Sequence, residues 1–243
     1  VRLMMKLFRR ISKEKSNKSG AILFDMDGTL IDSEPLWLKA EIEIMAEVGC
    51  HWDQQDQINC LGGPAERTER YMQVRSKNIK PYGYFMNRLH EVMKSKIANE
   101  LELIPNALEL LKECKDSGIK TALVTASSGD LMRIVLKRFP PKTFDIAVSR
   151  DDVKKTKPDP APYLLAAEQL SVDISTCLVL EDSLTGVESG IRSGAKVIGI
   201  PHLVQMQEHP ELRVISSLGD ICLNDILTWY PFLANKIESN DRS

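Results

Sequence analysis

Two aspartates stand two positions apart directly after a short apolar run, in the segment Asp-Met-Asp-Gly-Thr-Leu-Ile-Asp that begins at Asp25. In extended backbone, Asp25 and Asp27 project to the same side. A carboxylate such as Asp25 can attack phosphorus and form an acyl phosphate, which divides one difficult displacement into two easier ones. The second carboxylate, Asp27, can protonate the leaving alkoxide and afterwards activate water. The pair therefore favours phosphoryl-transfer chemistry through a covalent intermediate.

A second pair of acids follows another apolar run, since residues 177–180 end at Glu181 and Asp182. Two carboxylates that face a phosphate dianion repel it, so this chemistry requires a cation. Mg²⁺ prefers a few protein oxygens, several waters and a phosphate oxygen. We expect Asp25, the backbone carbonyl of Asp27 and Asp182 to hold the metal. Glu181 is either a direct ligand or the holder of a bound water.

Residues suited to binding phosphate oxygens occupy two further positions. Thr125 follows the apolar run 119–124. Its hydroxyl can bind phosphate together with the backbone N–H groups of Ala126 and Ser127. Lys157, in a Lys-Pro pair, can neutralise the remaining phosphate charge. Catalysis in such a site consists mostly of positioning and charge stabilisation.

Short apolar runs alternate along the chain with segments of helical pattern. The runs cover residues 21–24, 119–124, 144–148, 177–180 and 196–200. Because they are apolar on both faces, they are typical of strands buried in a parallel sheet. Helices are expected to begin at Pro105 and to cover residues 130–139, 160–170, 184–193 and 223–237. The alternation predicts a doubly wound α/β core.

Residues 34–100 interrupt the alternation, because they hold helical patterns at 36–48, 66–77 and 82–97 and no convincing strand. We expect a helical insert at 34–100, with the core formed by 20–33 and 101–235.

Ligands of open parallel sheets bind outside the carboxyl ends of the strands, where the strand order reverses. Asp25, Thr125 and Asp182 each follow an expected strand. The topology therefore predicts that these three residues meet in one site.

Bulk properties indicate an ordinary globular protein of 243 residues with a formal net charge of −2, which favours neither nucleic acid nor an anionic membrane as partner. Five scattered cysteines without a C-x-x-C pair suit a reducing cytoplasm. Residues 1–19 form a basic leader without the apolar run of a signal peptide, and we expect this leader to be mobile. No apolar stretch approaches the length of a bilayer span. We expect a cytoplasmic protein and, from its modest size, a monomer.

Four segments in order resemble the motifs of the haloacid dehalogenase superfamily: Asp25-x-Asp27-Gly28-Thr29, Thr125 after a strand, Lys157-Pro158 and Glu181-Asp182-Ser183. The insert resembles the C1 cap of that superfamily. The nearest branch is the one similar to β-phosphoglucomutase and phosphoglycolate phosphatase, and the match covers roughly residues 20–235. The resemblance implies a Rossmann-like three-layer core, a mobile cap, Mg²⁺, an aspartyl-phosphate intermediate and hydrolysis of a small phosphorylated metabolite.

One loop departs from the pattern of the sugar-phosphate mutase. The segment 61–68 is similar to the substrate-reading loop of this branch, but Glu66 occupies the place of the mutase's phosphate-gripping arginine, and Arg67 follows it. A second phosphate needs a correctly aimed cation. We therefore expect a Mg²⁺-dependent phosphatase of small phosphate monoesters, with Arg67 a candidate substrate contact. The alternatives are a phosphosugar mutase and a metal-binding regulatory module without turnover, although retention of both Asp25 and Asp27 argues against the latter.

Overall fold

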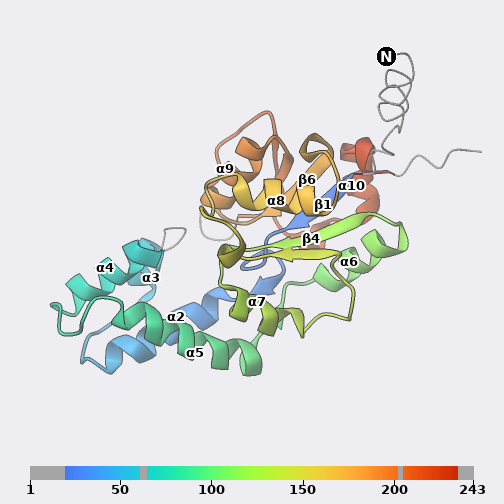
Figure 1. The fold of residues 1–243 in the computed structure, drawn as a ribbon. Coiled ribbons are helices and arrows are strands. Elements are labelled where there is room, and N and C mark those ends of the chain that lie inside the picture. Colours follow the sequence, from blue (N-terminus) through green and yellow to red (C-terminus); the bar gives the residue numbers. More distant parts are fainter. Residues whose placement is uncertain (1–19, 61–64, 202–204, 235–243) are drawn as a thin grey trace, which may run out of the picture.

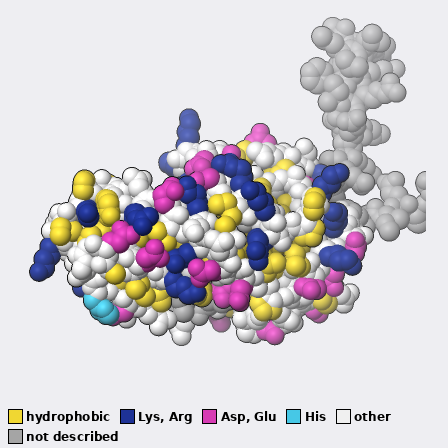
Figure 2. Space-filling view, turned by 90° about the horizontal axis from the view of Figure 1, so that it is seen from below, with side chains coloured by type: hydrophobic (Ala, Val, Ile, Leu, Met, Phe, Trp, Pro, Cys, Tyr) yellow, Lys and Arg dark blue, Asp and Glu magenta, His cyan; other side chains and the backbone are white. Residues whose placement is uncertain are grey.

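The computed structural model describes residues 20–60, 65–201 and 205–234. The basic leader predicted at 1–19 and the loop residues 61–64 lie outside these ranges. Within these ranges, no helix is both long and apolar enough to cross a membrane. Basic and acidic side chains are interspersed on the face of the molecule drawn in Figure 2.

Six strands form a parallel sheet in the order β5-β4-β1-β6-β7-β8. They are β1 (Ala21–Phe24), β4 (Lys120–Val124), β5 (Ile146–Val148), β6 (Cys177–Glu181), β7 (Lys196–Gly199) and β8 (Leu212–Val214). The first five confirm the strands predicted from apolar runs. The edge strand β8 was not predicted, because Arg213 and Val214 are exposed and its three residues form no apolar run.

Helices cover both faces of the sheet, as Figure 1 shows. In β1, Ile22 and Phe24 pack into one buried cluster, whereas Ala21 and Leu23 pack into the other. The first cluster includes side chains of α6 (Ala107–Asp116), α7 (Gly129–Leu136) and α10 (Leu223–Trp229). The second includes side chains of α8 (Ala161–Gln169) and α9 (Leu184–Ser193). This confirms the predicted three-layer α/β core.

Two helix boundaries differ from the sequence expectation. The helix expected from Pro105 begins at Ala107, because Asn106 adopts a left-handed φ of 68° and donates its side-chain amide to the carbonyls of Leu218 and Ile221. The last helix, expected over 223–237, ends at Trp229 and is followed by the 3₁₀ turn Pro231–Leu233. Proline lacks the N–H that would continue an α-helix.

The segment between β1 and the rest of the core folds into α2 (Glu34–Ala46), α3 (Gln54–Cys60), α4 (Ala65–Arg75) and α5 (Tyr84–Glu100), here called the insert helices. Figure 1 shows them as a group to one side of the sheet. The chain leaves and re-enters the core through two short antiparallel strands, β2 (Ile31–Asp32) and β3 (Glu102–Leu103). These strands and α3 were not predicted, because two-residue strands carry no periodicity and α3 is mostly polar.

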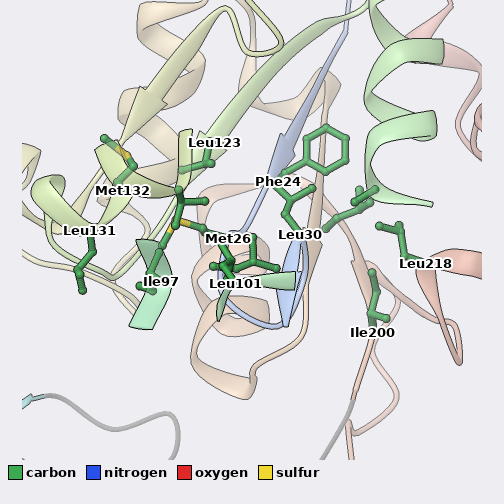
Figure 3. Close-up of a cluster of buried hydrophobic side chains, with 14 of the residues drawn as sticks. Phe24, Met26, Leu30, Ile97, Leu101, Leu123, Leu131, Met132, Ile200 and Leu218 are labelled. Atoms are coloured by element: carbon green, nitrogen blue, oxygen red, sulfur yellow. The ribbon is translucent and has the colours of Figure 1, made fainter. Parts of the chain in front are cut away.

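Buried side chains at this junction tie the insert helices to the core. Figure 3 shows Met26 and Leu30, which follow β1, close to Ile97 and Leu101 at the end of α5. All four are at most 2% exposed. Burial of an apolar side chain of this size contributes roughly 1.5–3 kcal/mol. The junction is therefore well packed, and its first residue, Met26, directly follows Asp25.

Candidate active site

The site lies where the order of the strands reverses. Phe24 of β1 pairs with Leu123 of β4 on one side and with Leu180 of β6 on the other. Each of these strands ends within two residues of that point, so the chain positions that follow are brought together. Asp25, Thr125 and Glu181 therefore stand side by side at one edge of the sheet, although about 150 residues separate the first from the last.

A buried lysine lies between two acids in this site. Lys157 Nζ donates to Asp25 Oδ1 at 2.5 Å, to Glu181 Oε1 at 2.6 Å and to the backbone carbonyl of Val124 at 2.9 Å. An ammonium group has three N–H bonds, and these partners use all of them. The Lys157 side chain is 3% exposed, so the ion pairs are shielded from water.

Burial and charge act together on this group. Burial, and after it the charge of Glu181, raises the pKa of Asp25 to about 8, against the opposing effect of Lys157. Burial by itself would lower the pKa of Lys157, but the negative charges of Asp25 and Glu181 outweigh it and hold that pKa well above its ordinary value. The pocket thus holds more negative charge than one lysine balances.

Asp182 adds a third acid. One carboxylate oxygen from each of Asp25, Glu181 and Asp182 lies within 4.8 Å of the others. Burial, and next the charges of Asp25 and Glu181, raises the pKa of Asp182 well above its ordinary value. A cation at this point would relieve the repulsion, and oxygen donors are the ligands that Mg²⁺ prefers. The residues present therefore fit a divalent cation.

Gly28 allows Asp182 to approach. Its φ is +76°, and a Cβ built there would lie 2.1 Å from Asp182 Oδ2. A residue with a side chain could not occupy this position while Asp182 keeps its place. The glycine of the first motif is thus required by a residue more than 150 positions later in the chain.

The Asp27 carboxylate takes no part in the acid cluster formed by the described side chains. Its Oδ1 accepts from the Ser33 hydroxyl at 2.8 Å, and its Oδ2 accepts from Ser127 Oγ at 2.8 Å and from Thr125 Oγ1 at 3.3 Å. The two motif aspartates therefore have different surroundings, one with a lysine and acids, the other with hydroxyl groups. The metal contribution expected of Asp27 is its backbone carbonyl, which this arrangement leaves unaffected.

Glu181 is held on all sides. It is fully buried, its Oε1 also accepts from the Tyr163 hydroxyl at 2.9 Å, and its Oε2 accepts from the Ser183 hydroxyl at 3.0 Å and from the Ser183 N–H at 3.2 Å. The next helix passes so close that a Cβ on Gly186 would lie 1.7 Å from Oε1. Both oxygens are thus engaged by the protein, which suits an anchoring role better than direct ligation.

A cleft of about 980 Å³ lies between the core and the insert helices. Thr125 and Glu181 are buried and do not line this cleft. The other residues proposed from sequence for the site all line it: Asp25, Asp27, Arg67, Ala126, Ser127, Lys157 and Asp182. Arg67 donates from Nη2 to the carbonyl of Asn59 at 2.6 Å, so its guanidinium is partly engaged within the insert.

Sequence reasoning missed Ser33, Thr156, Tyr163 and Gly186. Thr156 lines the cleft, and its hydroxyl is buried without a hydrogen-bond partner among the described residues. Its position next to Lys157 was a signal that could have been used. Tyr163 and Gly186 lie inside helices and gave no signal, because their roles depend on Glu181.

The chain matches the family model described as Haloacid dehalogenase-like hydrolase over residues 22–200. It is 30% identical over 220 residues to Hexitol phosphatase B of Escherichia coli (strain K12), covering 85% of this chain and 96% of that protein. It is 32% identical over 229 residues to Protein SUPPRESSOR OF QUENCHING 1, chloroplastic, of Arabidopsis thaliana, covering 90% of this chain but only 21% of that protein. The crystal structure of CbbY from Rhodobacter sphaeroides in complex with phosphate is similar, with a TM-score of 0.71 and 28% identity over 83% of this chain and 96% of that chain.

The parallel sheet with helices on both faces defines a doubly wound α/β protein. Its acidic side chains lie at the carboxyl ends of the strands, at the point where the strand order reverses. This chain belongs to the haloacid dehalogenase-like hydrolase family. The resemblance seen in the four motifs is thereby confirmed.

Proposed function

We propose that the chain is a Mg²⁺-dependent phosphatase that hydrolyses small phosphate monoesters, such as sugar phosphates, through a phosphorylated Asp25. The observation that carries the proposal is the state of the Asp25 carboxylate. Its Oδ1 is held by Lys157, while Oδ2 has no hydrogen bond to any described residue. A buried carboxylate with one oxygen fixed and the other unbonded is suited to nucleophilic attack.

The remaining residues have complementary roles in this proposal. Asp27, held by Ser33 and Ser127, donates a proton to the leaving oxygen and later accepts one from water. Lys157, whose three N–H bonds are used by Asp25, Glu181 and Val124, offsets the charge of the phosphate electrostatically. The N–H of Ala126 and the Thr156 hydroxyl, which has no partner among the described residues, bind phosphate oxygens. Thr125 and Ser127 contribute when their hydroxyls turn from Asp27 to the phosphate.

Asp25, Asp182 and the Asp27 carbonyl would hold Mg²⁺, with Glu181 anchoring Lys157. The metal, when bound, supplies positive charge that offsets the acids and the phosphate.

Residues 34–100 act as a cap over a core formed by 20–33 and 101–235. The cleft between them encloses the reacting groups, and closure of the cap would exclude water during transfer. The five free cysteines suit the cytoplasmic location expected from sequence, and a monomer remains our expectation.

Hydrolysis is favoured over a phosphosugar mutase by the charge beside Arg67. A mutase must hold a second phosphate, and Arg67 donates from one of its five N–H groups to the carbonyl of Asn59, so it is only partly available. The neighbouring Glu66, which lines the same cleft, would repel a phosphate.

The test is the turnover of p-nitrophenyl phosphate by wild type, Asp25→Asn and Asp32→Asn. Asp32 is an exposed acid on β2, so it serves as a control for loss of a carboxylate in this segment. We expect Asp25→Asn to lose activity by at least about 10³-fold with its melting temperature retained, and Asp32→Asn to stay near wild type. Chelation should abolish wild-type turnover and added Mg²⁺ should restore it. Near wild-type turnover by Asp25→Asn would refute the nucleophile, and a folded wild type without turnover would favour the regulatory module.

A further inference from the structure

Glu41 is a buried acid on the insert side of the cleft. It lies on α2, is 4% exposed and contributes to the lining of the same cleft as Asp25. The Trp52 Nε1–H donates to its Oε2 at 3.0 Å, which fixes the orientation of the carboxylate. Its Oε1 receives no hydrogen bond from the described residues. One oxygen of a buried acid is thus available within the cleft.

Among the side chains that the structure describes, no lysine, arginine or histidine forms an ion pair with Glu41. Burial raises its pKa to about 7, which the Trp52 hydrogen bond opposes and the charge of Asp56 reinforces. Burying an acid without a partner is unfavourable, and such a group in a native protein calls for an explanation.

The insert side of the cleft carries two further buried polar side chains, which are uncharged. Gln57 and Thr68 also line the cleft from the insert helices and are 4% and 8% exposed. Gln57 donates one N–H of Nε2 to the carbonyl of Glu34 at 2.9 Å, so its carbonyl oxygen and its second N–H are left for a ligand. Together with Glu41, these side chains form a wall that offers hydrogen-bond acceptors, an amide N–H and a hydroxyl. The basic side chains that line the cleft from the described insert residues are Arg67 and His90, and His90 pairs with Asp130.

Hydroxyl groups match such a wall, whereas a second phosphate does not. A hydroxyl can donate to the free oxygen of Glu41 and accept from a protonated carboxyl. A second phosphate dianion bound beside Glu41 would face a buried carboxylate that has no ion-pair partner among the described side chains, and like charges brought together in a desolvated site repel strongly. The other arginine of the cleft, Arg150, has Asp151 as its neighbour.

We propose that Glu41 is a specificity-determining residue that binds a hydroxyl of the leaving group, so that the enzyme takes singly phosphorylated polyols or sugars and discriminates against bisphosphates. This inference rests on the proposed phosphatase function. It adds the chemistry of the leaving group and the residue that recognises it.

The experiment compares kcat/KM for three substrates: sorbitol 6-phosphate, fructose 1,6-bisphosphate and p-nitrophenyl phosphate. Glu41→Leu removes the polar group. We expect the kcat/KM of this variant for sorbitol 6-phosphate, divided by its kcat/KM for p-nitrophenyl phosphate, to fall at least about tenfold. Glu41→Gln keeps the shape and removes the charge, and we expect its preference for sorbitol 6-phosphate over the bisphosphate to fall by a similar factor. Glu43→Gln is the matched control, because Glu43 is an exposed acid on the same helix that pairs with Lys96 at 3.1 Å. Both ratios of the control should equal those of wild type.

The outcomes distinguish a failure of the role proposed for Glu41 from a failure of the proposed phosphatase activity. A wild type that hydrolyses p-nitrophenyl phosphate, with ratios unchanged in both Glu41 variants, would overturn the role of Glu41 and leave the phosphatase intact. A wild type that hydrolyses none of the three would overturn the phosphatase and the inference with it. The wild-type enzyme provides a test that needs no variant, since equal or better use of the bisphosphate than of sorbitol 6-phosphate would also overturn the inference.

Discussion

His90 of α5 and Asp130 of α7 contact each other across the cleft, with 2.6 Å between Nε2 and Oδ2. The pair joins an insert helix to a core helix. Asp130 also accepts from the Ser128 hydroxyl at 2.7 Å. That bond first, and His90 in addition, holds the pKa of Asp130 at about 2. A contact of this kind favours the arrangement in which the insert lies against the core.

Removing this contact should loosen the insert helices. We expect Asp130→Asn to speed amide hydrogen exchange in residues 84–100 and to raise KM several-fold, because the closed arrangement loses a partner. Because the folded-state pKa of Asp130 lies below its ordinary value, its contribution is present above about pH 4 and is lost as the pH falls toward 2. Glu91→Gln is the control, since Glu91 pairs with Lys94 within α5. Equal exchange in Asp130→Asn and wild type would contradict this role.

Lys157→Met should be strongly destabilising without metal. It leaves Asp25 and Glu181 buried without their cation, and breaking a buried pair on one side costs about 3–5 kcal/mol. The measurement is urea denaturation with chelator and again with Mg²⁺. A divalent ion should recover part of the loss, because it supplies positive charge to the same acids. If the free energy of unfolding falls by less than about 1 kcal/mol, Lys157 does not balance the charges of Asp25 and Glu181.

Gly186→Ala should impair the site although alanine favours helices over glycine by about 1 kcal/mol. The added Cβ would collide with Glu181, which cannot move without releasing Lys157. We expect lower thermal stability and a fall in kcat of at least about tenfold. Glu188→Ala on the exposed side of α9 is the comparison, and it should remain within about 0.5 kcal/mol of wild type. A more stable and fully active Gly186→Ala would refute the packing argument.

Glu41 should make stability depend on pH. Its folded-state pKa is about 7 against 4.5 ordinarily, so folding disfavours the ionised form. The wild type is therefore most stable, with respect to this group, below about pH 4.5, and it loses stability as the pH rises toward 7. Glu41→Gln has no carboxyl group to ionise at this position. Between pH 5 and 8, its free energy of unfolding should therefore rise by up to about 3 kcal/mol relative to that of wild type. Denaturation curves at both pH values measure the difference. A constant difference between the two proteins, or one that shrinks at high pH, would show that Glu41 is not buried as an acid.

The α/β core could be predicted because buried parallel strands need apolar residues on both faces. The runs at 21–24 and 177–180 have that pattern, and β1 and β6 form there. The short strands β2 and β3 could not be found in this way. They form because the chain leaves and re-enters the core at one place. This is a requirement of the tertiary structure, and no local sequence pattern indicates it.

The motif residues Asp25, Thr125, Lys157 and Asp182 could be selected from sequence, because each occupies an expected strand end or a Lys-Pro pair. The predicted meeting of Asp25, Thr125 and Asp182 follows from parallel topology, whereas Lys157 was included because of its Lys-Pro pair. Their catalytic and metal-binding roles remain proposals that the variants above address.

The sequence alone determined the layers of the fold, the family and the residue types gathered at the carboxyl edge of the sheet, because periodicity and strand ends are local properties. Only the tertiary structure decided that Tyr163 and Gly186 contact Glu181 and that His90 pairs with Asp130. It also decided that Glu41 is buried without an ion-pair partner among the described side chains. Those relationships join residues on different elements, where helix packing and the exclusion of water set distance and charge, and no spacing along the chain encodes them.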